Sequence, residues 1–165
     1  MRRMDDCVHL GIDPASTRIA LVAYHDADEP IFAENKKLGK SGAPACSAAR
    51  QETLAFVEKC RERWPGLAVV AAVESPVVGR GGPRATIVQA FASGAIQGAL
   101  FDAGVEVSLA NVSSWKKRVI GNGRASKEDI ANFVGLRWPT FFSQAEGSQD
   151  LADAICIARY GELTA

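Results

Sequence analysis

Runs of apolar residues alternate along the chain with polar segments rich in Gly and Pro, and this alternation predicts five strands. Residues 7–13 and 17–25 are two apolar runs joined by the turn sequence PAST, so they are expected to form an antiparallel hairpin. The segment PIFAENKK (30–37) predicts a third strand. The continuous apolar run LAVVAAVES (67–75) is typical of a strand buried on both faces, and VEVSLAN (105–111) predicts the last strand.

The helices are predicted from apolar residues at helical spacing, over 45–63, 84–103, 112–119, 126–138 and 148–160. SGAPACS, before the first helix, is expected to be a loop. Three strands followed by alternating helix and strand indicate an α/β class with a five-stranded mixed sheet, whose first three strands are antiparallel and whose faces carry helices. A chain of 165 residues suits one domain, spanning 1–165.

Composition excludes several classes of protein. The four cysteines show no CxxC pair and the chain has only two histidines, so a Cys/His metal site is not expected. The longest uncharged run, 85–101, contains Thr, Gln, Ser and Gly and is typical of a buried helix, so no membrane span is expected. No signal peptide is visible, and we expect a cytoplasmic protein with reduced thiols. Bacterial, phage and organellar origins all stay open.

The basic residues are unevenly distributed, although the formal net charge is zero. Between Ser75 and Lys127 there are seven basic and two acidic residues, which favours a face that binds phosphate. The basic residues in this segment are Arg80, Arg84, Lys116, Lys117, Arg118, Arg124 and Lys127.

Two predicted core strands end on a carboxylate, Asp13 and Glu74, and the last helix carries Asp150 and Asp153 three residues apart on one face. Singly, each acid has an ordinary explanation: Asp13 could start a turn before Pro14, and Asp150 could stabilise a helix N-terminus. If the two strands are parallel neighbours, all four acids converge without a compensating base. Hard divalent cations with oxygen ligands would relieve the resulting repulsion, and two could lie about 3.5–4 Å apart.

The order of these motifs resembles one known family. GIDP on the first strand, VES on the fourth, the segment KKRVIGNGRASK and DLADAICIA on the last helix resemble the RuvC Holliday-junction resolvases, which belong to the RNase H-like nuclease superfamily. The match runs from about Cys7 to Gly161, and the last two motifs are its most specific parts. GIDP alone is also similar to the first strand of sugar kinases and actin-like ATPases, which need a second such domain.

The resemblance implies a homodimeric endonuclease that cuts opposed strands of a four-way DNA junction and leaves 5′-phosphate ends. By resemblance, the catalytic acids and metal ligands are Asp13, Glu74, Asp150 and Asp153, and the functional lysines are Lys116 and Lys127. Two Mg²⁺ ions per site are implied, and Mn²⁺ is expected to substitute. A metal-bound water would attack phosphorus, and either lysine would stabilise the developing charge.

The basic segment is expected to contact DNA, with Arg80 and Arg84 in a loop whose glycines allow close approach to a phosphate backbone. The sequence departs from the family near Val77, where a stacking aromatic is common; Phe91 or Trp115 could supply the ring instead. Two other functions stay open: an RNase H-like nuclease for other branched or RNA-containing substrates, and a non-catalytic nucleic-acid-binding relative. The cleavage sequence is not predicted.

Helix 84–103 has no wide polar stripe, and this favours a symmetric dimer with Phe91, Gly94 and Gly98 at the interface. A twofold axis there would direct two acid clusters to the same side, which suits the opposed strands of a junction. The alternative is a helix buried on all sides within one monomer.

Overall fold

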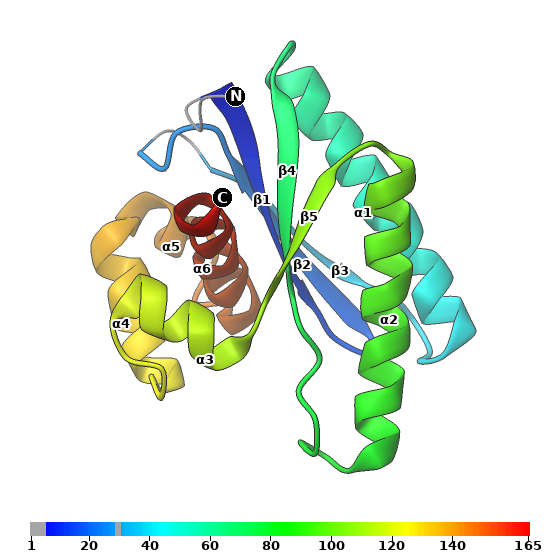
Figure 1. Cartoon of the computed structure of the whole chain (residues 1–165). Coiled ribbons are helices and arrows are strands. Elements are labelled where there is room, and N and C mark those ends of the chain that lie inside the picture. Colours follow the sequence, from blue (N-terminus) through cyan, green and yellow to red (C-terminus); the bar gives the residue numbers. More distant parts are fainter. Residues whose placement is uncertain (1–5, 29–30) are drawn as a thin grey trace.

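The computed structural model describes residues 6–28 and 31–165, and a five-stranded mixed sheet forms its centre (Figure 1). The strands lie in the order β3-β2-β1-β4-β5. Strands β1, β2 and β3 are antiparallel neighbours, whereas β4 pairs in parallel with both β1 and β5. The predicted α/β class and mixed sheet are confirmed. The strands are β1 (Cys7–Pro14), β2 (Arg18–Tyr24), β3 (Phe32–Lys37), β4 (Ala68–Glu74) and β5 (Glu106–Ala110).

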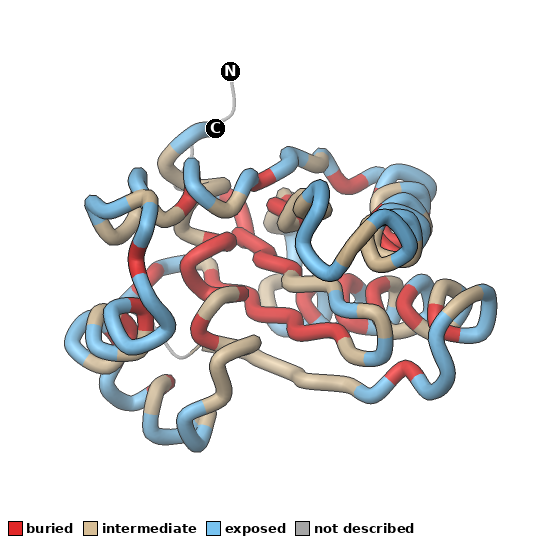
Figure 2. The backbone as a smooth tube through the Cα atoms, turned by 90° about the horizontal axis from the view of Figure 1, so that it is seen from below, coloured by how far each residue is buried: buried red, intermediate tan, exposed pale blue. Residues whose placement is uncertain are grey.

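Helices cover both faces of the sheet. Figure 1 shows α1 and α2 on one side and α6, with α3, α4 and α5 beyond it, on the other. The helical elements are α1 (Ala43–Arg63), α2 (Pro83–Asp102), α3 (Val112–Trp115), the π-helical turn η2 (Lys116–Ile120), α4 (Lys127–Arg137), α5 (Pro139–Gln144) and α6 (Gln149–Thr164). In Figure 2 the buried stretches run through the centre of the molecule.

Several predicted boundaries are wrong. α1 begins at Ala43, within the segment expected to be a loop, because Pro44 suits a first helical turn. The helix predicted over 112–119 is one α-helical turn followed by η2, and α5 was not predicted. The predicted strand 30–37 begins at Phe32; its first residue lies outside the described part. α6 extends to Thr164, beyond the expected end at 160.

Side chains alternate along β1 between the two cores of the protein. Val8, Leu10 and Ile12 are buried among α1, α2 and the same face of β4. Gly11 and Asp13, at the alternate positions, therefore face α6. The same alternation in β4 places Ala72 in the core on the α6 side, so Glu74 also faces α6. Strand pairing and pleat together direct both acids towards one helix.

Candidate active site

Two adjacent parallel strands end together at the acid edge of the sheet. Ile12 pairs with Val73 in parallel register, so Asp13 and Glu74, the next residue on each strand, lie side by side. Both are partly buried, and β1 ends one residue after Asp13. The two strands are parallel neighbours, which is the condition on which the convergence of these acids depended in the sequence.

Helix α6 crosses directly over β1 at Gly11. A Cβ added to Gly11 would lie 2.0 Å from the carbonyl oxygen of Ala154 and 2.5 Å from the backbone nitrogen of Ala158. No side chain fits there, so the backbones of α6 and β1 are in contact. This contact brings the first turns of α6, with Asp150 and Asp153, over the strand end that carries Asp13.

The start of α6 is fixed by two side-chain hydrogen bonds. Ser148 caps the helix, and its Oγ accepts from the backbone N–H of Leu151 at 3.3 Å. One turn later, the Gln149 side-chain amide donates to Oδ1 of Asp153 at 2.8 Å. Asp153 is therefore held in position by a neutral group.

The four carboxylates form one electrostatic cluster. Burial, reinforced by the negative charges of Glu74, Asp153 and Asp150, raises the pKa of Asp13 well above its usual range. Burial also raises the pKa of Glu74 to about 7, although the Trp115 hydrogen bond partly opposes it. The pKa of Asp153 rises to about 6, again mainly through burial. The cluster is thus poised to accept positive charge.

The donor set fits a hard divalent cation. In residues 6–28 and 31–165 none of the four carboxylates forms an ion pair with lysine or arginine. Carboxylate oxygens are the ligands that Mg²⁺ and Mn²⁺ prefer. Within the same residues, no three acidic, His or Cys side chains stand close enough to hold one ion together. To share a cation, some of the four side chains would have to move closer together.

Both predicted lysines lie at the cluster. Nζ of Lys116 donates to the carbonyl oxygen of Ala125 at 2.9 Å, and its charge lowers the pKa values of Glu74 and Asp153. Lys127 lowers the pKa of Asp153 and begins α4 directly after Ser126, which caps that helix through a capping box with Asp129. These lysines belong to two helical segments joined by the loop 121–126.

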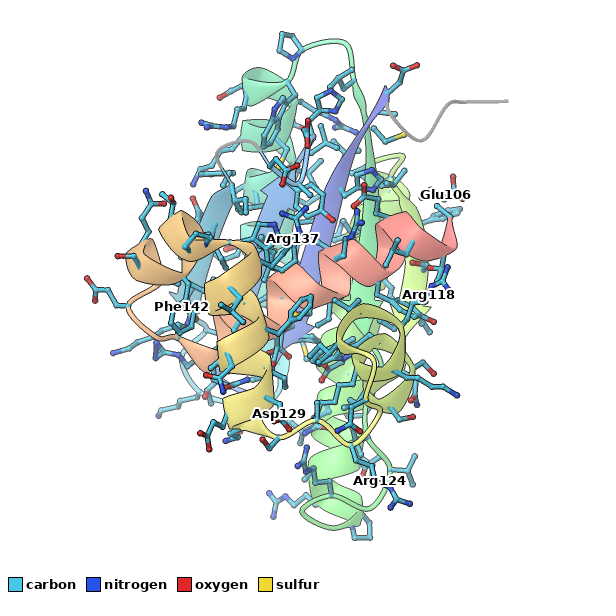
Figure 3. The ribbon with its side chains drawn as sticks, turned by 90° about the vertical axis from the view of Figure 1, so that its left-hand side faces the viewer. Glu106, Arg118, Arg124, Asp129, Arg137 and Phe142 are labelled. Atoms are coloured by element: carbon cyan, nitrogen blue, oxygen red, sulfur yellow. The ribbon has the colours of Figure 1, made fainter. Side chains whose placement is uncertain are left out.

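The other basic residues of the predicted DNA-binding segment are exposed, and they differ in their relation to the acids. Arg80 is exposed, yet its charge lowers the pKa of Glu74. Lys117, Arg118 and Arg124 are also exposed. Figure 3 shows Arg118 beside η2 and Arg124 on the loop before α4, and one guanidinium N–H of Arg118 donates to Leu163 O at 3.3 Å. Arg84 is exposed in the first turn of α2 and has no resolved influence on the acids.

Trp115 is the site residue whose role sequence reasoning missed. Its indole Nε1–H donates to Oε2 of Glu74 at 2.9 Å, and the side chain is only 1 % exposed. Trp115 therefore cannot supply the missing stacking ring, and of the two alternatives only Phe91, which is exposed, stays open. Val78, in the loop after Glu74, is 87 % exposed, whereas Val77 is partly buried.

One face of α2 has no partner among residues 6–28 and 31–165. Phe91 is 64 % and Phe101 81 % exposed, and a Cβ added to Gly94 or Gly98 would meet nothing within 4 Å. The opposite face, with Ile96 and Leu100, is packed on the sheet. The alternative of a helix buried on all sides within the monomer is therefore wrong.

No helix in the described residues is both long enough and apolar enough to cross a membrane.

Comparisons with known proteins identify the fold. No protein-family model matches the sequence, and no curated protein matches it. Among solved structures, RuvC of Thermus thermophilus superposes with a TM-score of 0.71 at 25% identity, covering 93% of this chain and 92% of that one. The same protein in complex with a Holliday junction substrate gives 0.71 at 23% identity, covering 93% and 91%.

The yeast mitochondrial Holliday junction resolvase Ydc2 matches with a TM-score of 0.55 at 10% identity, over 95% of this chain and 78% of that one. These matches span nearly the whole chain. They bear out the resemblance carried by the four motifs. The chain has the RNase H-like fold of the RuvC-type Holliday-junction resolvases.

Proposed function

We propose that this protein is a divalent-metal-dependent DNA endonuclease that resolves four-way junctions by paired phosphodiester hydrolysis, leaving 5′-phosphate ends. One observation carries the proposal. Four carboxylates from β1, β4 and α6 gather at one edge of a RuvC-type fold without an ion-pair partner among the described residues. A buried arrangement of like charges is costly and serves no packing purpose.

Each residue has a role that follows from its position. Asp13, Glu74, Asp150 and Asp153 would hold Mg²⁺ or Mn²⁺, two ions per site. Bound there, the cations would supply a lowered pKa for the attacking water and neutralise charge on the attacking and leaving oxygens. Lys116 and Lys127, whose positive charges are felt at Asp153, would stabilise the additional negative charge of the transition state.

The exposed basic residues would bind the arms of the junction. Arg80 lies between the glycines of the loop before α2, and Arg84 follows that loop in the first turn of α2. The loop glycines Gly79, Gly81 and Gly82 have φ between 81° and 87°. Lys117, Arg118 and Arg124 extend the same basic segment beyond Lys116. Such contacts position the backbone and carry no sequence information directly.

A homodimer would provide the second cut. Five exposed residues of α2 follow one another at spacings of four and three, which is typical of a helix that packs against another helix. They are Ile87, Phe91, Gly94, Gly98 and Phe101. We name these five residues the α2 stripe. Its two glycines permit close approach of a second α2, and a twofold axis there would pair two active sites for opposed strands.

The dimer is tested by sedimentation. The unaltered protein should sediment at about twice the 17.5 kDa of the chain. Gly94→Glu, which places a charge in the centre of the α2 stripe, should shift it towards monomer and convert paired cuts to single nicks. Ser143→Glu, at an exposed position of α5 on the opposite side of the sheet, is the control for the added charge. A Gly94→Glu protein that stays dimeric and still makes paired cuts would move the interface elsewhere.

A substrate panel tests the activity. Labelled four-way, three-way, flap and RNA–DNA hybrid substrates are incubated with Mg²⁺, with Mn²⁺ or with EDTA. The proposal predicts symmetric nicks in the four-way junction, a 5′-phosphate at each, and no cutting in EDTA. Preference for three-way, flap or hybrid substrates would indicate the broader RNase H-like nuclease. Junction binding with no cutting by the unaltered protein in either metal would indicate a non-catalytic relative.

A further inference from the structure

We propose that Trp115 is a positioning residue of the metal centre, which holds the Glu74 carboxylate in its metal-binding orientation through the indole N–H. The inference rests on the proposed function, because it assigns Glu74 to metal binding. Trp115 touches no reacting atom and acts through Glu74 and, on its ring face, through Lys116.

The strand pairing explains how Trp115 reaches Glu74. The last residue of β5, Ala110, pairs with Glu74, and its carbonyl oxygen accepts from the backbone N–H of Ser75 at 2.9 Å. Asn111 caps the single turn α3, with its side chain accepting from the N–H of Ser113 at 3.1 Å. That turn ends at Trp115, so the indole lies over the end of the neighbouring strand.

The indole N–H suits a carboxylate that must keep its charge. A neutral donor fixes one oxygen, Oε2, at 2.9 Å, while a lysine or arginine in that place would neutralise the carboxylate and compete with a cation. No other hydrogen bond to the Glu74 carboxylate is found in the part of the chain that the structure describes. Oε1 is therefore available to a metal.

The ring also lies beside the functional lysine. Nζ of Lys116 stands 5.8 Å from the centre of the Trp115 ring, and the ring itself is packed among Ala110, Ala125 and α6. One rigid, buried side chain thus contacts a metal-binding acid at its edge and a lysine at its face. Supporting groups of this kind fix the orientation of ligands and raise metal affinity.

Burial of the indole alone does not explain why Trp115 donates to a carboxylate, as a comparison with Trp138 indicates. A buried indole needs an acceptor, which backbone carbonyls commonly supply. Trp138, also buried, donates to the carbonyl oxygen of Ala27 at 2.8 Å, and Ala27 lies near the end of α6 that carries Glu162. Trp138→Phe removes an equivalent N–H and is the matched control for Trp115→Phe.

The test measures the binding of Mn²⁺ by isothermal titration to the unaltered protein and to both variants. Trp115→Phe should weaken Mn²⁺ binding by about tenfold, and raise the Mg²⁺ concentration needed for half-maximal cleavage by a similar factor. Trp138→Phe should leave both unchanged even where its melting temperature falls. A folded Trp115→Phe protein with Mn²⁺ affinity within about twofold of the unaltered protein would overturn the inference.

A second measurement covers the case in which Trp115→Phe does not fold. The indole N–H resonances of the unaltered protein, assigned with Trp64→Phe and Trp138→Phe, are followed during titration with Mg²⁺. Trp115 should shift and the other two should not; a static Trp115 resonance with bound Mg²⁺ overturns the inference. Metal binding without junction cleavage would defeat the proposed nuclease and leave the inference standing, whereas a protein that binds no metal defeats both.

Discussion

The carboxylates at the two ends of α6 differ in their polar partners. Near its end, Glu162 accepts from the Tyr24 hydroxyl at 2.7 Å and pairs with Arg159 at 2.5 Å. At its beginning, Asp150 and Asp153 face Asp13 and Glu74 with no ion pair in the described part of the chain, and the polar contacts of Asp153 and Glu74 come from a neutral amide and an indole. Within one helix, therefore, one acid is neutralised by a base and two are not. The difference supports the proposal that the acid edge is a functional site, held at the expense of stability.

The largest expected effect is on cleavage. Asp13→Asn, Glu74→Gln and Asp153→Asn should each lower junction cutting at saturating Mg²⁺ by about a thousandfold, since metal ligation is worth several kcal/mol in the transition state. Asp150→Asn should be equally severe or slightly milder. Binding of the junction should persist, because less negative charge then faces phosphate.

Glu162→Gln is the matched control for these variants, because it removes a carboxylate from the same helix. It should cut the junction at close to the normal rate. Near-normal nicking by Asp13→Asn, or loss of cutting by Glu162→Gln, would contradict the distinction between the two ends of α6.

A single methyl group on β1 should separate the two halves of the site. Gly11→Ala would force its Cβ against the backbone of α6, which costs about 1–3 kcal/mol of unfolding free energy and moves Asp153 away from Asp13. Cutting should fall further than stability alone explains, measured on the folded fraction. Gly135→Ala in α4, where the added Cβ meets only Phe142 at 3.4 Å, should leave cutting unchanged and raise the unfolding free energy by about 0.5–1 kcal/mol.

The next effect is on stability without metal. The folded-state pKa of Glu74, about 7, exceeds its ordinary 4.5, so the native state retains this proton while the unfolded state loses it. The metal-free protein should therefore lose about 2 kcal/mol as the pH rises from about 4.5 to 7. Asp153, with a pKa of about 6, adds to the loss at lower pH. Chemical denaturation across this range in EDTA measures the slope.

Substitutions at the two ends of α6 should then change stability in opposite directions. At pH 8 in EDTA, Asp13→Asn should raise the unfolding free energy by relieving repulsion, whereas Glu162→Gln should lower it by about 1 kcal/mol. Added Mg²⁺ should stabilise the unaltered protein and not Asp13→Asn. Destabilisation by Asp13→Asn in EDTA would show that the acid edge is under no electrostatic strain.

The smallest effects are expected from substitutions of the basic residues that would contact DNA. Arg80→Ala and Arg84→Ala should each reduce the slope of log affinity against log salt by about 0.9 on duplex arms, with little change in cutting once DNA is saturating. Lys116→Ala and Lys127→Ala should instead lower the cleavage rate of the bound junction. Unchanged slopes in both arginine variants would remove the loop before α2 from the interface.

The sequence predicted the sheet and its acids because those signals are local. The apolar runs of β1 and β4 each end on a carboxylate, and the parallel pairing follows from the order of the elements. The hydrogen bond between Trp115 and Glu74 joins residues 41 positions apart, and no periodic pattern in the sequence predicts it. The close approach of α6 to β1 depends on the absence of a side chain at Gly11. The sequence does not predict this role, because the backbone that contacts Gly11 belongs to a distant segment.

Two further features, η2 and the uncovered face of α2, could not be predicted from local sequence patterns either. Residues 112–120 show a helical pattern, but nothing in it distinguishes the α-helical turn from η2, which differs only in its hydrogen-bond spacing. For α2 the apolar pattern is compatible with two alternatives, a dimer or complete burial within the monomer. Packing of only one face on the sheet excludes the second, and the uncovered α2 stripe favours the first.

The most direct test of the account replaces Mg²⁺ by Fe²⁺ and locates the metal in the unaltered chain. Ascorbate and peroxide generate hydroxyl radicals at bound iron, which cut the nearby backbone, and mass spectrometry maps the cuts. The account predicts cuts around Asp13, Glu74 and the segment Asp150–Asp153, suppressed by excess Mg²⁺ and absent in Asp13→Asn. Cuts that cluster elsewhere, or that persist unchanged in Asp13→Asn, would contradict a metal centre at the acid edge.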